Sequence, residues 1–254
     1  MDLTKENYHS TINNNKYMSF TQFKQFLDCE ASAMAIITGE WQEPCTTAML
    51  VGAYVDAYFS GELEQFKCEK PEIFKRDGEL KSDYLQANII IDRIRASEAM
   101  MKYLTGDMQV TMTGEIAGVP FKIRMDSYKP GEFICDLKVM RDFKNVWQDG
   151  EKKNFVEAWG YDYQAAIYRE IEGNNLPFII AAAAGKTAGS VVDIELMYIP
   201  DDVLCDRIAT VRELAPMFQM IKLGLKEPGR CGKCDFCKAT KVLGEPVDYR
   251  EVGE

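Results

Sequence analysis

Two side chains of opposite charge, Asp136 and Lys138, lie within an apolar stretch of the chain that reads EFICDLKV. The run 132–139 is predicted to be a β-strand, in which alternate side chains share a face. Ile134, Asp136 and Lys138 are therefore expected on one face. Burying two charges costs several kcal/mol unless they pair with each other or bind a metal ion. The strand thus indicates either a structural ion pair or part of a catalytic site.

Two further acids precede this strand in positions that allow them to join it. The run 121–126 reads as a strand that places Asp126 and Arg124 on one face. Glu115 stands just before the turn that precedes that run. If the three predicted strands pair as a meander, we expect Glu115, Asp126 and Asp136 to converge on one site.

Three carboxylates and a lysine suit metal-dependent hydrolysis of a phosphodiester bond. Carboxylate oxygens are preferred ligands of Mg²⁺ and Mn²⁺. Such an ion lowers the pKa of a bound water and stabilises charge that develops on a phosphate. Lys138 would orient or deprotonate that water, or neutralise the transition state. Glu115, Asp126 and Asp136 are the predicted metal ligands.

The acid-x-lysine pattern alone is weak, because the chain also contains it at 79–81, 142–144 and 151–153. Such residues are mostly exposed. The apolar strand around Asp136 distinguishes it, and a structural ion pair on a sheet face remains the alternative. A predicted helix from 155 to 171 adds Gln164 and Tyr168, which share one helix face. They would either lean over the metal site or belong to an ordinary core helix.

A second candidate metal site is formed by cysteines. Cys231, Cys234 and Cys237 follow a C-x₂-C-x₂-C spacing, which is typical of metal or cluster ligands. A closed site needs a fourth ligand, and Cys29 in an early helical segment is the candidate. The residues leave three alternatives: an iron–sulfur cluster, a zinc ion, or free thiols. The remaining four cysteines are expected to be small core residues; they are Cys45, Cys68, Cys135 and Cys205.

Composition narrows the possible functions. The chain has 254 residues, a net charge of −10 and a single histidine, His9. One histidine excludes multi-histidine zinc sites and argues against Ser-His-Asp or Cys-His catalysis. The acidic total argues against a protein that coats DNA non-specifically, although the segment 122–153 carries eight basic and six acidic residues. With neither a secretory signal nor a membrane-spanning run, we expect a reducing, cytoplasmic location.

The elements that must position these residues alternate between helical and strand patterns. Helices are predicted at 19–37, 46–59, 83–104, 155–171 and 200–225, and strands at 110–116, 121–126, 132–139, 177–184 and 191–199. Helices packed on one mixed sheet imply an α/β fold. We expect an N-terminal arm (1–18), one main domain (19–226) and a cysteine-containing tail (227–254) that packs on the same domain.

The order of the motifs resembles a known nuclease superfamily. Glu115, Asp126, Asp136-Leu137-Lys138 and Gln164-Ala165-Ala166-Ile167-Tyr168 resemble the PD-(D/E)xK nucleases. They resemble more closely the RecE-like exonucleases of phages and prophages, with their D…D-x-K…Q-x-x-x-Y pattern. The resemblance covers about residues 20–240.

This resemblance implies a restriction-endonuclease-like α/β fold in which a mixed sheet is flanked by helices. It implies a Mg²⁺-dependent exonuclease that degrades linear double-stranded DNA from free ends in phage-type recombination. It further implies a single-strand annealing protein as partner, a homo-oligomer, and the cytoplasm of a bacterial host. The early cysteine and three late ones resemble the iron–sulfur nucleases of the AddB type and of CRISPR adaptation, which implies a 4Fe–4S cluster.

One position departs from the pattern. RecB-like relatives often carry a histidine in an early helix, as G-x-x-[V/I]-H, and the matching stretch here is Gly52-Ala53-Tyr54-Val55-Asp56. Asp56 could still ligate the metal as a carboxylate, or it could be a helix-surface acid. The alternative function is a non-catalytic DNA-binding or assembly protein that keeps the nuclease fold.

Overall fold

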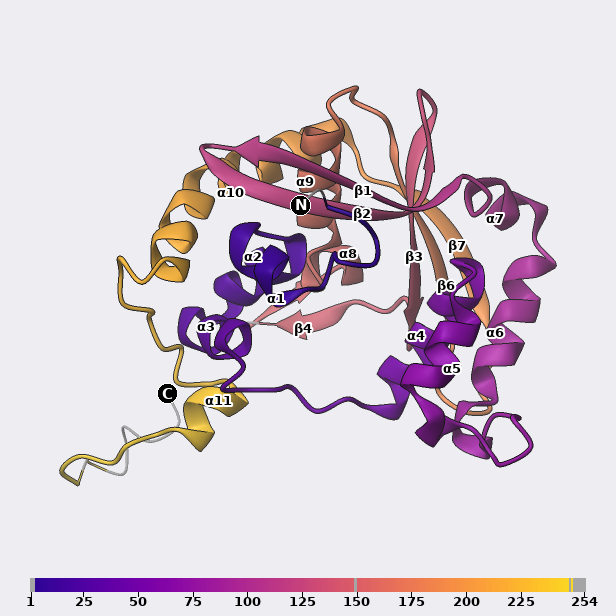
Figure 1. The fold of residues 1–254 in the computed structure, drawn as a ribbon, viewed down its shortest axis with the longest axis horizontal. Helices are drawn as coiled ribbons and strands as arrows, with labels where there is room; N and C mark the ends of the chain where they lie inside the picture. Colours follow the sequence, from indigo (N-terminus) through magenta and orange to yellow (C-terminus); the bar gives the residue numbers. More distant parts are fainter. Residues whose placement is uncertain (1–2, 149, 247, 249–254) are drawn as a thin grey trace.

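A mixed five-stranded sheet lies at the centre of the molecule (Figure 1). The computed structural model describes residues 3–148, 150–246 and 248. The strand order is β1-β2-β3-β6-β7, with β3 parallel to β6 and the other neighbours antiparallel. The strands are β1 (Asp107–Ile116), β2 (Val119–Lys129), β3 (Phe133–Met140), β6 (Phe178–Ala184) and β7 (Asp193–Tyr198). The predicted meander and the two later strands are confirmed.

The sheet forks between β2 and β3. These strands pair only through Ser127–Lys129 and Phe133–Cys135, whereas β1 and β2 continue together as a long hairpin. Figure 1 shows this hairpin curving away from β3. Beyond Cys135, β3 is therefore paired to β6 on one edge and has no β2 ladder on the other. The fork opens directly beside Asp126 and Asp136.

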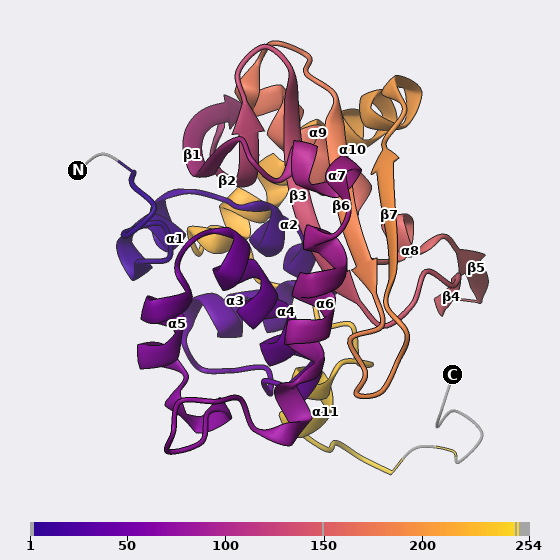
Figure 2. The same ribbon diagram turned by 90° about the vertical axis from the view of Figure 1, so that its right-hand side faces the viewer.

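Helices cover both faces of the sheet (Figures 1 and 2). The helices are α1 (Thr11–Lys16), α2 (Phe20–Asp28), α3 (Glu30–Thr38), α4 (Thr47–Phe59), α5 (Leu63–Glu69), α6 (Gln86–Arg95), α7 (Glu98–Tyr103), α8 (Phe155–Ala158), α9 (Tyr161–Glu172), α10 (Asp201–Lys222) and α11 (Asp235–Ala239). Two 3₁₀ turns add η1 (Pro71–Ile73) and η2 (Ser82–Tyr84). A small hairpin of β4 (Val146–Gln148) and β5 (Glu151–Lys153) is absent from the predicted elements.

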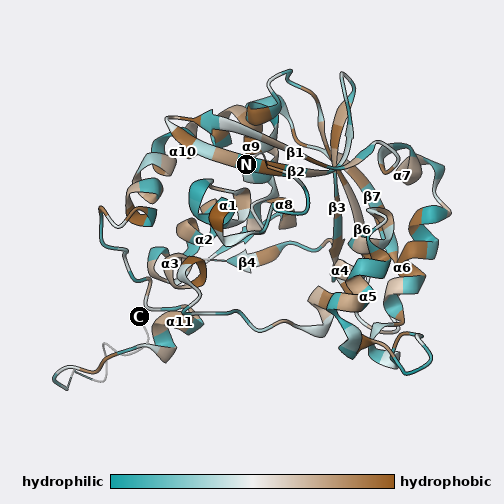
Figure 3. Ribbon diagram, in the orientation of Figure 1, coloured by the Kyte–Doolittle hydropathy of each residue, from teal (hydrophilic) through white to brown (hydrophobic). Residues whose placement is uncertain are grey.

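The two faces of the central strands belong to two separate apolar cores. Ile134 packs into the core shared with α2, α9 and α10, while its neighbour Cys135 packs into the core shared with α4 and α6. β6 reads FIIAAAA and is buried along its whole length, because helices cover both of its sides. Helices such as α6 and α10 show both hydrophobic and hydrophilic residues (Figure 3), as expected for helices with one side on a core.

Three of the predicted helices are divided in the structure. The helix predicted at 19–37 breaks at Cys29, whose backbone is extended, with φ −168° and ψ 112°. The one at 155–171 breaks at Gly160, whose φ of 71° suits glycine. The one at 83–104 restarts at Ser97, whose side chain accepts a hydrogen bond from the Met100 amide. Hydrophobic periodicity continued through these breaks and therefore did not reveal them.

Segments near both ends of the described chain pack on the main body, whereas the residues described after α11 are exposed. Met18 forms an isolated parallel bridge to Phe121 of β2, with hydrogen bonds to Pro120 and Lys122. At the other end α11 lies beside α3. Within the described residues, no helix is both long and apolar enough to cross a membrane.

Candidate active site

Asp136 on β3 lies at the centre of a polar cluster in the fork of the sheet. Its side chain is buried, and its Oδ1 accepts a hydrogen bond of 2.5 Å from Gln164 Nε2 on α9. Its Oδ2 lies 2.5 Å from Lys138 Nζ. The structure thus brings together three of the predicted site residues, from one strand and one helix.

Lys138 is held as a cation. Burial alone would lower the pKa of its ammonium group, but the carboxylates of Asp136 and Asp126 outweigh that effect and raise the pKa. Its Nζ also lies 4.7 Å from the ring centroid of Tyr161, at the start of α9. A protonated Lys138 can orient a water or neutralise charge, and it cannot remove a proton in this state.

At the fork, the side chain of Asp126 accepts the backbone hydrogen bond that a neighbouring strand would otherwise accept. Its Oδ2 accepts a 2.9 Å hydrogen bond from the backbone amide of Leu137, which the departing β2 leaves without a ladder partner. Its Oδ1 accepts from Gln109 Nε2 at 3.3 Å. Burial, followed by the negative charges of Asp136 and Asp56, raises the pKa of Asp126 well above its usual range.

Asp56 reaches the same cluster from α4, on the other side of the fork. Burial raises its pKa to about 6, with opposing contributions from the charges of Arg124 and Asp136. Asp56 lines a cleft of about 630 Å³ together with Arg124. The carboxyl group at this position therefore faces the candidate site and is not a solvated helix-surface acid.

The donor set suits a hard divalent cation. Burial, together with neighbouring carboxylates, raises the pKa values of Asp56 and Asp126, so a cation bound between them would stabilise their charged forms. Gln164 Oε1 is buried without a hydrogen-bond donor, and Asp136 Oδ2 has the Lys138 ammonium as its contact. In the described part of the chain, no three carboxylates form a ready-made ligand cage. This arrangement fits Mg²⁺, which usually takes one or two carboxylates and keeps several waters.

Tyr168 lies one turn after Gln164 on α9 and is buried, as Gln164 is. Its hydroxyl donates a 3.1 Å hydrogen bond to the backbone carbonyl of Arg124 on β2. Tyr168 is buried in the core beneath the strand. It therefore fixes the β2 backbone two residues before Asp126. Burial raises the pKa of its hydroxyl, and the nearby charges of Asp136 and Asp126 add to that effect.

Glu115 does not join the cluster. It is exposed and pairs with Pro120 at the β1–β2 turn. Pro120 is six residues from Asp126 along β2, which corresponds to about 20 Å of extended strand. The predicted convergence of three acids from the meander does not occur, because the β1–β2 hairpin is too long for its tip to return to the fork. Asp56 supplies the third nearby carboxylate instead.

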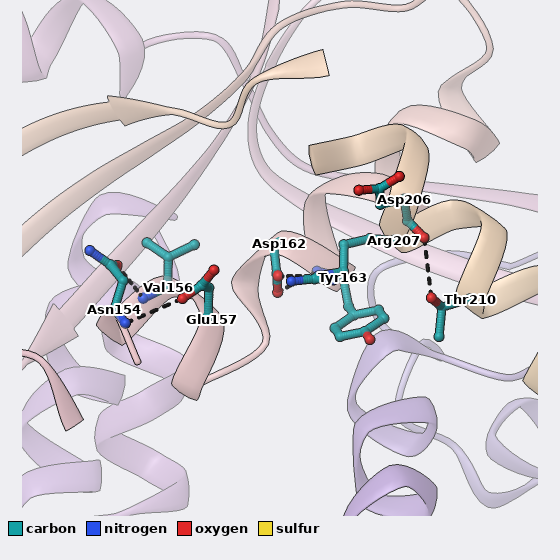
Figure 4. A network of polar contacts seen from close by, with 8 residues as sticks. All are labelled: Asn154, Val156, Glu157, Asp162, Tyr163, Asp206, Arg207 and Thr210. Atoms are coloured by element: carbon teal, nitrogen blue, oxygen red, sulfur yellow. Dashed lines mark hydrogen bonds and ion pairs between the residues drawn. The ribbon is translucent and has the colours of Figure 1, made fainter. Parts of the chain in front are cut away.

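A buried ion pair anchors the helix that carries Gln164. Asp162 in the first turn of α9 pairs with Arg207 of α10, and its Oδ1 accepts from the Tyr163 amide (Figure 4). Ahead of it, Asn154 and Glu157 form a reciprocal capping box on α8. These contacts fix the start of α9, and thereby the position from which Gln164 reaches Asp136.

The four predicted cysteine ligands form a second cluster, remote from the carboxylates in sequence. The Sγ atoms of Cys29, Cys231, Cys234 and Cys237 all lie within 4.8 Å of one another. Cys29 Sγ is 3.6 Å from Cys237 Sγ, although the residues are 208 apart in the sequence. Backbone amides of residues 233 and 234 point at Cys231 Sγ, and the pKa of the Cys231 thiol is lowered to about 6, because these amide hydrogen bonds outweigh the effect of burial.

The break in the early helix explains how Cys29 reaches this cluster. The extended backbone at Cys29 separates α2 from α3 and turns the thiol toward α11. Of the four remaining cysteines, the core prediction is correct for Cys135 alone. The other three are exposed, because they lie on loops or outward helix faces; they are Cys45, Cys68 and Cys205.

Comparison with known families decides the class of this fold. The family model described as a PDDEXK-like domain of unknown function (DUF3799) matches residues 19–240. The chain belongs to this family. The predicted PD-(D/E)xK superfamily and the restriction-endonuclease-like fold are thereby confirmed, and membership of a PDDEXK-like family supports a nuclease function.

A solved structure agrees with this assignment. The crystal structure of a protein from Eubacterium rectale, described as a candidate exonuclease, is 42% identical over 100% of both chains, with a TM-score of 0.91. The solved structure of SSO0001 is 15% identical over 85% of this PDDEXK-like chain and 93% of its own, with a TM-score of only 0.34. A search of curated proteins finds no match.

Proposed function

We propose that this PDDEXK-like protein is a Mg²⁺- or Mn²⁺-dependent exonuclease that hydrolyses phosphodiester bonds of linear double-stranded DNA. The observation that carries the proposal is the grouping of Asp126, Asp136, Lys138 and Gln164 at the fork of the sheet. Membership of a PDDEXK-like family and a similar solved structure described as a candidate exonuclease support the same function. The RecE-like pattern supports a role in phage-type recombination.

Each residue has a chemical task in this proposal. Asp126 and Asp136 would hold the cation, with Asp56 close enough to assist. The bound ion supplies an acidified water and charge stabilisation at the phosphate. Lys138, kept protonated by its neighbours, stabilises charge on the phosphate oxygens or orients the attacking water. Gln164 holds Asp136 by its Oδ1 and leaves Oδ2 toward Lys138.

We propose further that DNA with free ends is the substrate, that a single-strand annealing protein uses the product, and that the protein acts as a homo-oligomer in the bacterial cytoplasm. These points come from the RecE-like resemblance. They are tested by the end requirement of the reaction, by pull-down with an annealing protein, and by light scattering.

The cysteine cluster is proposed to hold one metal centre with a structural role. A tetrahedral zinc ion with Zn–S bonds of about 2.3 Å places its ligands roughly 3.8 Å apart. Two of the Sγ–Sγ separations, 3.6 Å and 4.0 Å, are close to that spacing, and all of them are within 4.8 Å. A 4Fe–4S cluster, whose iron and sulfide atoms stand between the thiolates, would hold them roughly 6 Å apart. The spacing favours Zn²⁺ over the cluster.

The test of the main proposal is incubation of the protein with linear and with covalently closed duplex DNA, in Mg²⁺ and in EDTA. Mg²⁺-dependent loss of the linear DNA alone is the expected result. Loss of both substrates would keep the site and remove the requirement for ends. If neither is lost while DNA still binds, the alternative of a non-catalytic DNA-binding protein is correct.

The Lys138→Ala variant tests whether the cluster is the catalytic site. Loss of the ammonium removes the charge beside Asp136, so the cleavage rate should fall at least about 100-fold while DNA binding is retained. Lys241→Ala removes an exposed lysine and serves as the matched control. Equal rates for the two variants would contradict the assignment.

A further inference from the structure

A guanidinium group that faces the candidate cleft has no ion-pair or hydrogen-bond partner among the residues that the structure describes. Arg124 is half-buried on β2, two residues before Asp126, and it lines the cleft together with Asp56. Among the described residues, no carboxylate lies within ion-pair distance of Arg124, and its side chain donates no hydrogen bond. Half-buried arginines that serve the fold are normally paired, so this one has five donors to offer a ligand.

The N-terminal segment fixes the position of this guanidinium. The ring of Tyr8 is buried, and the Arg124 guanidinium carbon lies 5.3 Å from its centroid, a stacking distance for a cation on an aromatic face. Lys122 holds Tyr8 in place, because its ammonium donates to the Tyr8 carbonyl and, at 2.7 Å, to Asn14 Oδ1. The Tyr8 hydroxyl donates in turn to the Lys122 carbonyl at 3.4 Å.

The surroundings of Arg124 indicate what it would bind. The cleft is lined by four acids and, apart from Arg124, by Lys5 as its other cation. Lys5 is exposed and pairs with Glu62 at 3.5 Å. Of the two cations that line this cleft, Arg124 is the one without an ion pair to a described residue. It is also the one closer in sequence to the proposed metal ligands. A planar guanidinium with free donors matches two phosphate oxygens at once.

We propose that Arg124 binds a phosphate group of the DNA substrate in the cleft, and that Tyr8 is the residue that positions it. This inference rests on the proposed nuclease function and adds a phosphate-binding residue to it. The N-terminal segment is then part of the active site, since the stacking surface for the guanidinium comes from Tyr8. Two phosphates present this chemistry, an internal diester of the strand and a terminal 5′-phosphate.

A DNA-binding assay tests the role of Arg124 without requiring cleavage. The full-length protein is titrated with fluorescent duplexes that carry either a 5′-phosphate or a 5′-hydroxyl, in EDTA and in Ca²⁺, and anisotropy is recorded. Arg124→Gln should weaken binding about 10-fold, whereas Arg95→Gln, an exposed arginine on α6, should change it less than about 2-fold. If wild type prefers the 5′-phosphate and Arg124→Gln abolishes the preference, the ligand is the terminal phosphate. Equal losses on both duplexes assign an internal one.

Single-turnover cleavage in Mg²⁺ gives the second readout. Arg124→Gln should slow cleavage about 100-fold, and Arg124→Lys should recover only part of that loss because an ammonium cannot bind in a bidentate manner. Unchanged binding and cleavage in Arg124→Gln, with an unaltered melting temperature, would overturn the proposal. A wild-type protein that binds DNA without cutting it would defeat the proposed function and leave the binding test of Arg124 in force.

The role of Tyr8 is tested by a conservative pair of variants. Tyr8→Phe keeps the aromatic face, loses only the 3.4 Å hydroxyl hydrogen bond to the Lys122 carbonyl, and should retain most of the binding that Tyr8→Leu loses. Tyr8→Leu keeps an apolar side chain but removes the face, and should lose about 3- to 10-fold in phosphate binding. Equal behaviour of the two variants would remove the positioning role from Tyr8.

Discussion

At the scale of single residues, the two carboxylate oxygens of Asp136 have different partners in the candidate site. Oδ1 is held by Gln164 and Oδ2 by Lys138, each at 2.5 Å. The amide of Gln164 thus orients the carboxylate without adding charge. Residues that orient metal ligands in this way typically contribute 10- to 100-fold to metal affinity or activity.

Gln164→Leu should therefore slow Mg²⁺-dependent cleavage about 10- to 100-fold, because Asp136 Oδ1 loses its donor. The concentration of Mg²⁺ that gives half-maximal cleavage should rise at the same time. Gln42→Leu, an exposed glutamine, should leave both quantities unchanged. A normal Mg²⁺ dependence in Gln164→Leu would show that this hydrogen bond does not position a ligand.

Residue types and the alternation of side chains along a strand were sufficient to predict that Asp136 and Lys138 pair and that Asp126 lies near them. They were insufficient for Glu115, because the length of the β1–β2 hairpin decides where its tip lies. The shared face of Arg124 and Asp126 was visible in the sequence. That Arg124 would lack a partner was not, since the pairing of a charge depends on elements distant in the chain.

At the scale of elements, α9 is fixed to α10 by the ion pair between Asp162 and Arg207 (Figure 4). The carboxylate is buried, and the guanidinium also lies over the Tyr163 ring at 5.2 Å. Removing one member of such a pair leaves the other as an uncompensated buried charge.

Arg207→Met should accordingly destabilise the protein by about 3 kcal/mol, as measured by urea unfolding. The double variant Asp162→Asn/Arg207→Met should recover much of that loss. On the same helix, Arg212 pairs with Glu170 at the surface, so Arg212→Met should cost less than about 1 kcal/mol. A similar cost for both single variants would argue against a special role of the buried pair.

Lys222, at the end of α10, lies in surroundings that disfavour its charged form. Lys222 Nζ donates to the Tyr17 carbonyl and to Gln22 Oε1, and burial, with a smaller effect of Lys122, lowers its pKa to about 8. Between about pH 8 and the ordinary lysine value, the unfolded chain binds more protons than the folded one. Stability should therefore rise with pH across that window.

The predicted pH dependence is checked by measuring the free energy of unfolding of wild type and of Lys222→Met between pH 7.5 and pH 10. The difference in free energy of unfolding should change by about 2 kcal/mol across that range, with wild type gaining as the pH rises. Lys226→Met, an exposed neighbour, should follow wild type. Parallel curves for wild type and Lys222→Met would contradict the lowered pKa.

Element boundaries were the weaker part of the sequence prediction. The five sheet strands and the long helices follow from hydrophobic period, but the break at Cys29 does not. Its extended backbone accompanies a contact between its thiol and that of Cys237, 208 residues away. A local pattern contains no information about such a contact.

At the scale of the whole molecule, the cysteine cluster joins the α2–α3 junction to the tail around α11. Thiolates gathered this closely without a cation would repel one another. A bound ion would remove that repulsion and connect segments from near both ends of the chain.

Cys231→Ser should abolish stoichiometric metal binding and lower the free energy of unfolding by at least about 2 kcal/mol. Nuclease activity should change only as far as the loss of stability requires. Elemental analysis and the visible spectrum identify the centre: one zinc per chain and no colour are expected. Cys205→Ser, at an exposed cysteine of α10, is the matched control. Iron with visible absorption would identify a cluster, and metal-free protein of full stability would mean free thiols.

The fork of the sheet makes the site sensitive to the alignment of two strands. Asp126 occupies the place of a backbone acceptor for Leu137, at the point where β2 leaves β3. Inserting or deleting one residue in β2 would exchange inward and outward side chains and put Met125 or Ser127 in that place. If the cluster is the catalytic site, its activity therefore depends on strand register. A change of length between Arg124 and Ser127 would displace Asp126, whereas the hairpin tip lies away from the fork.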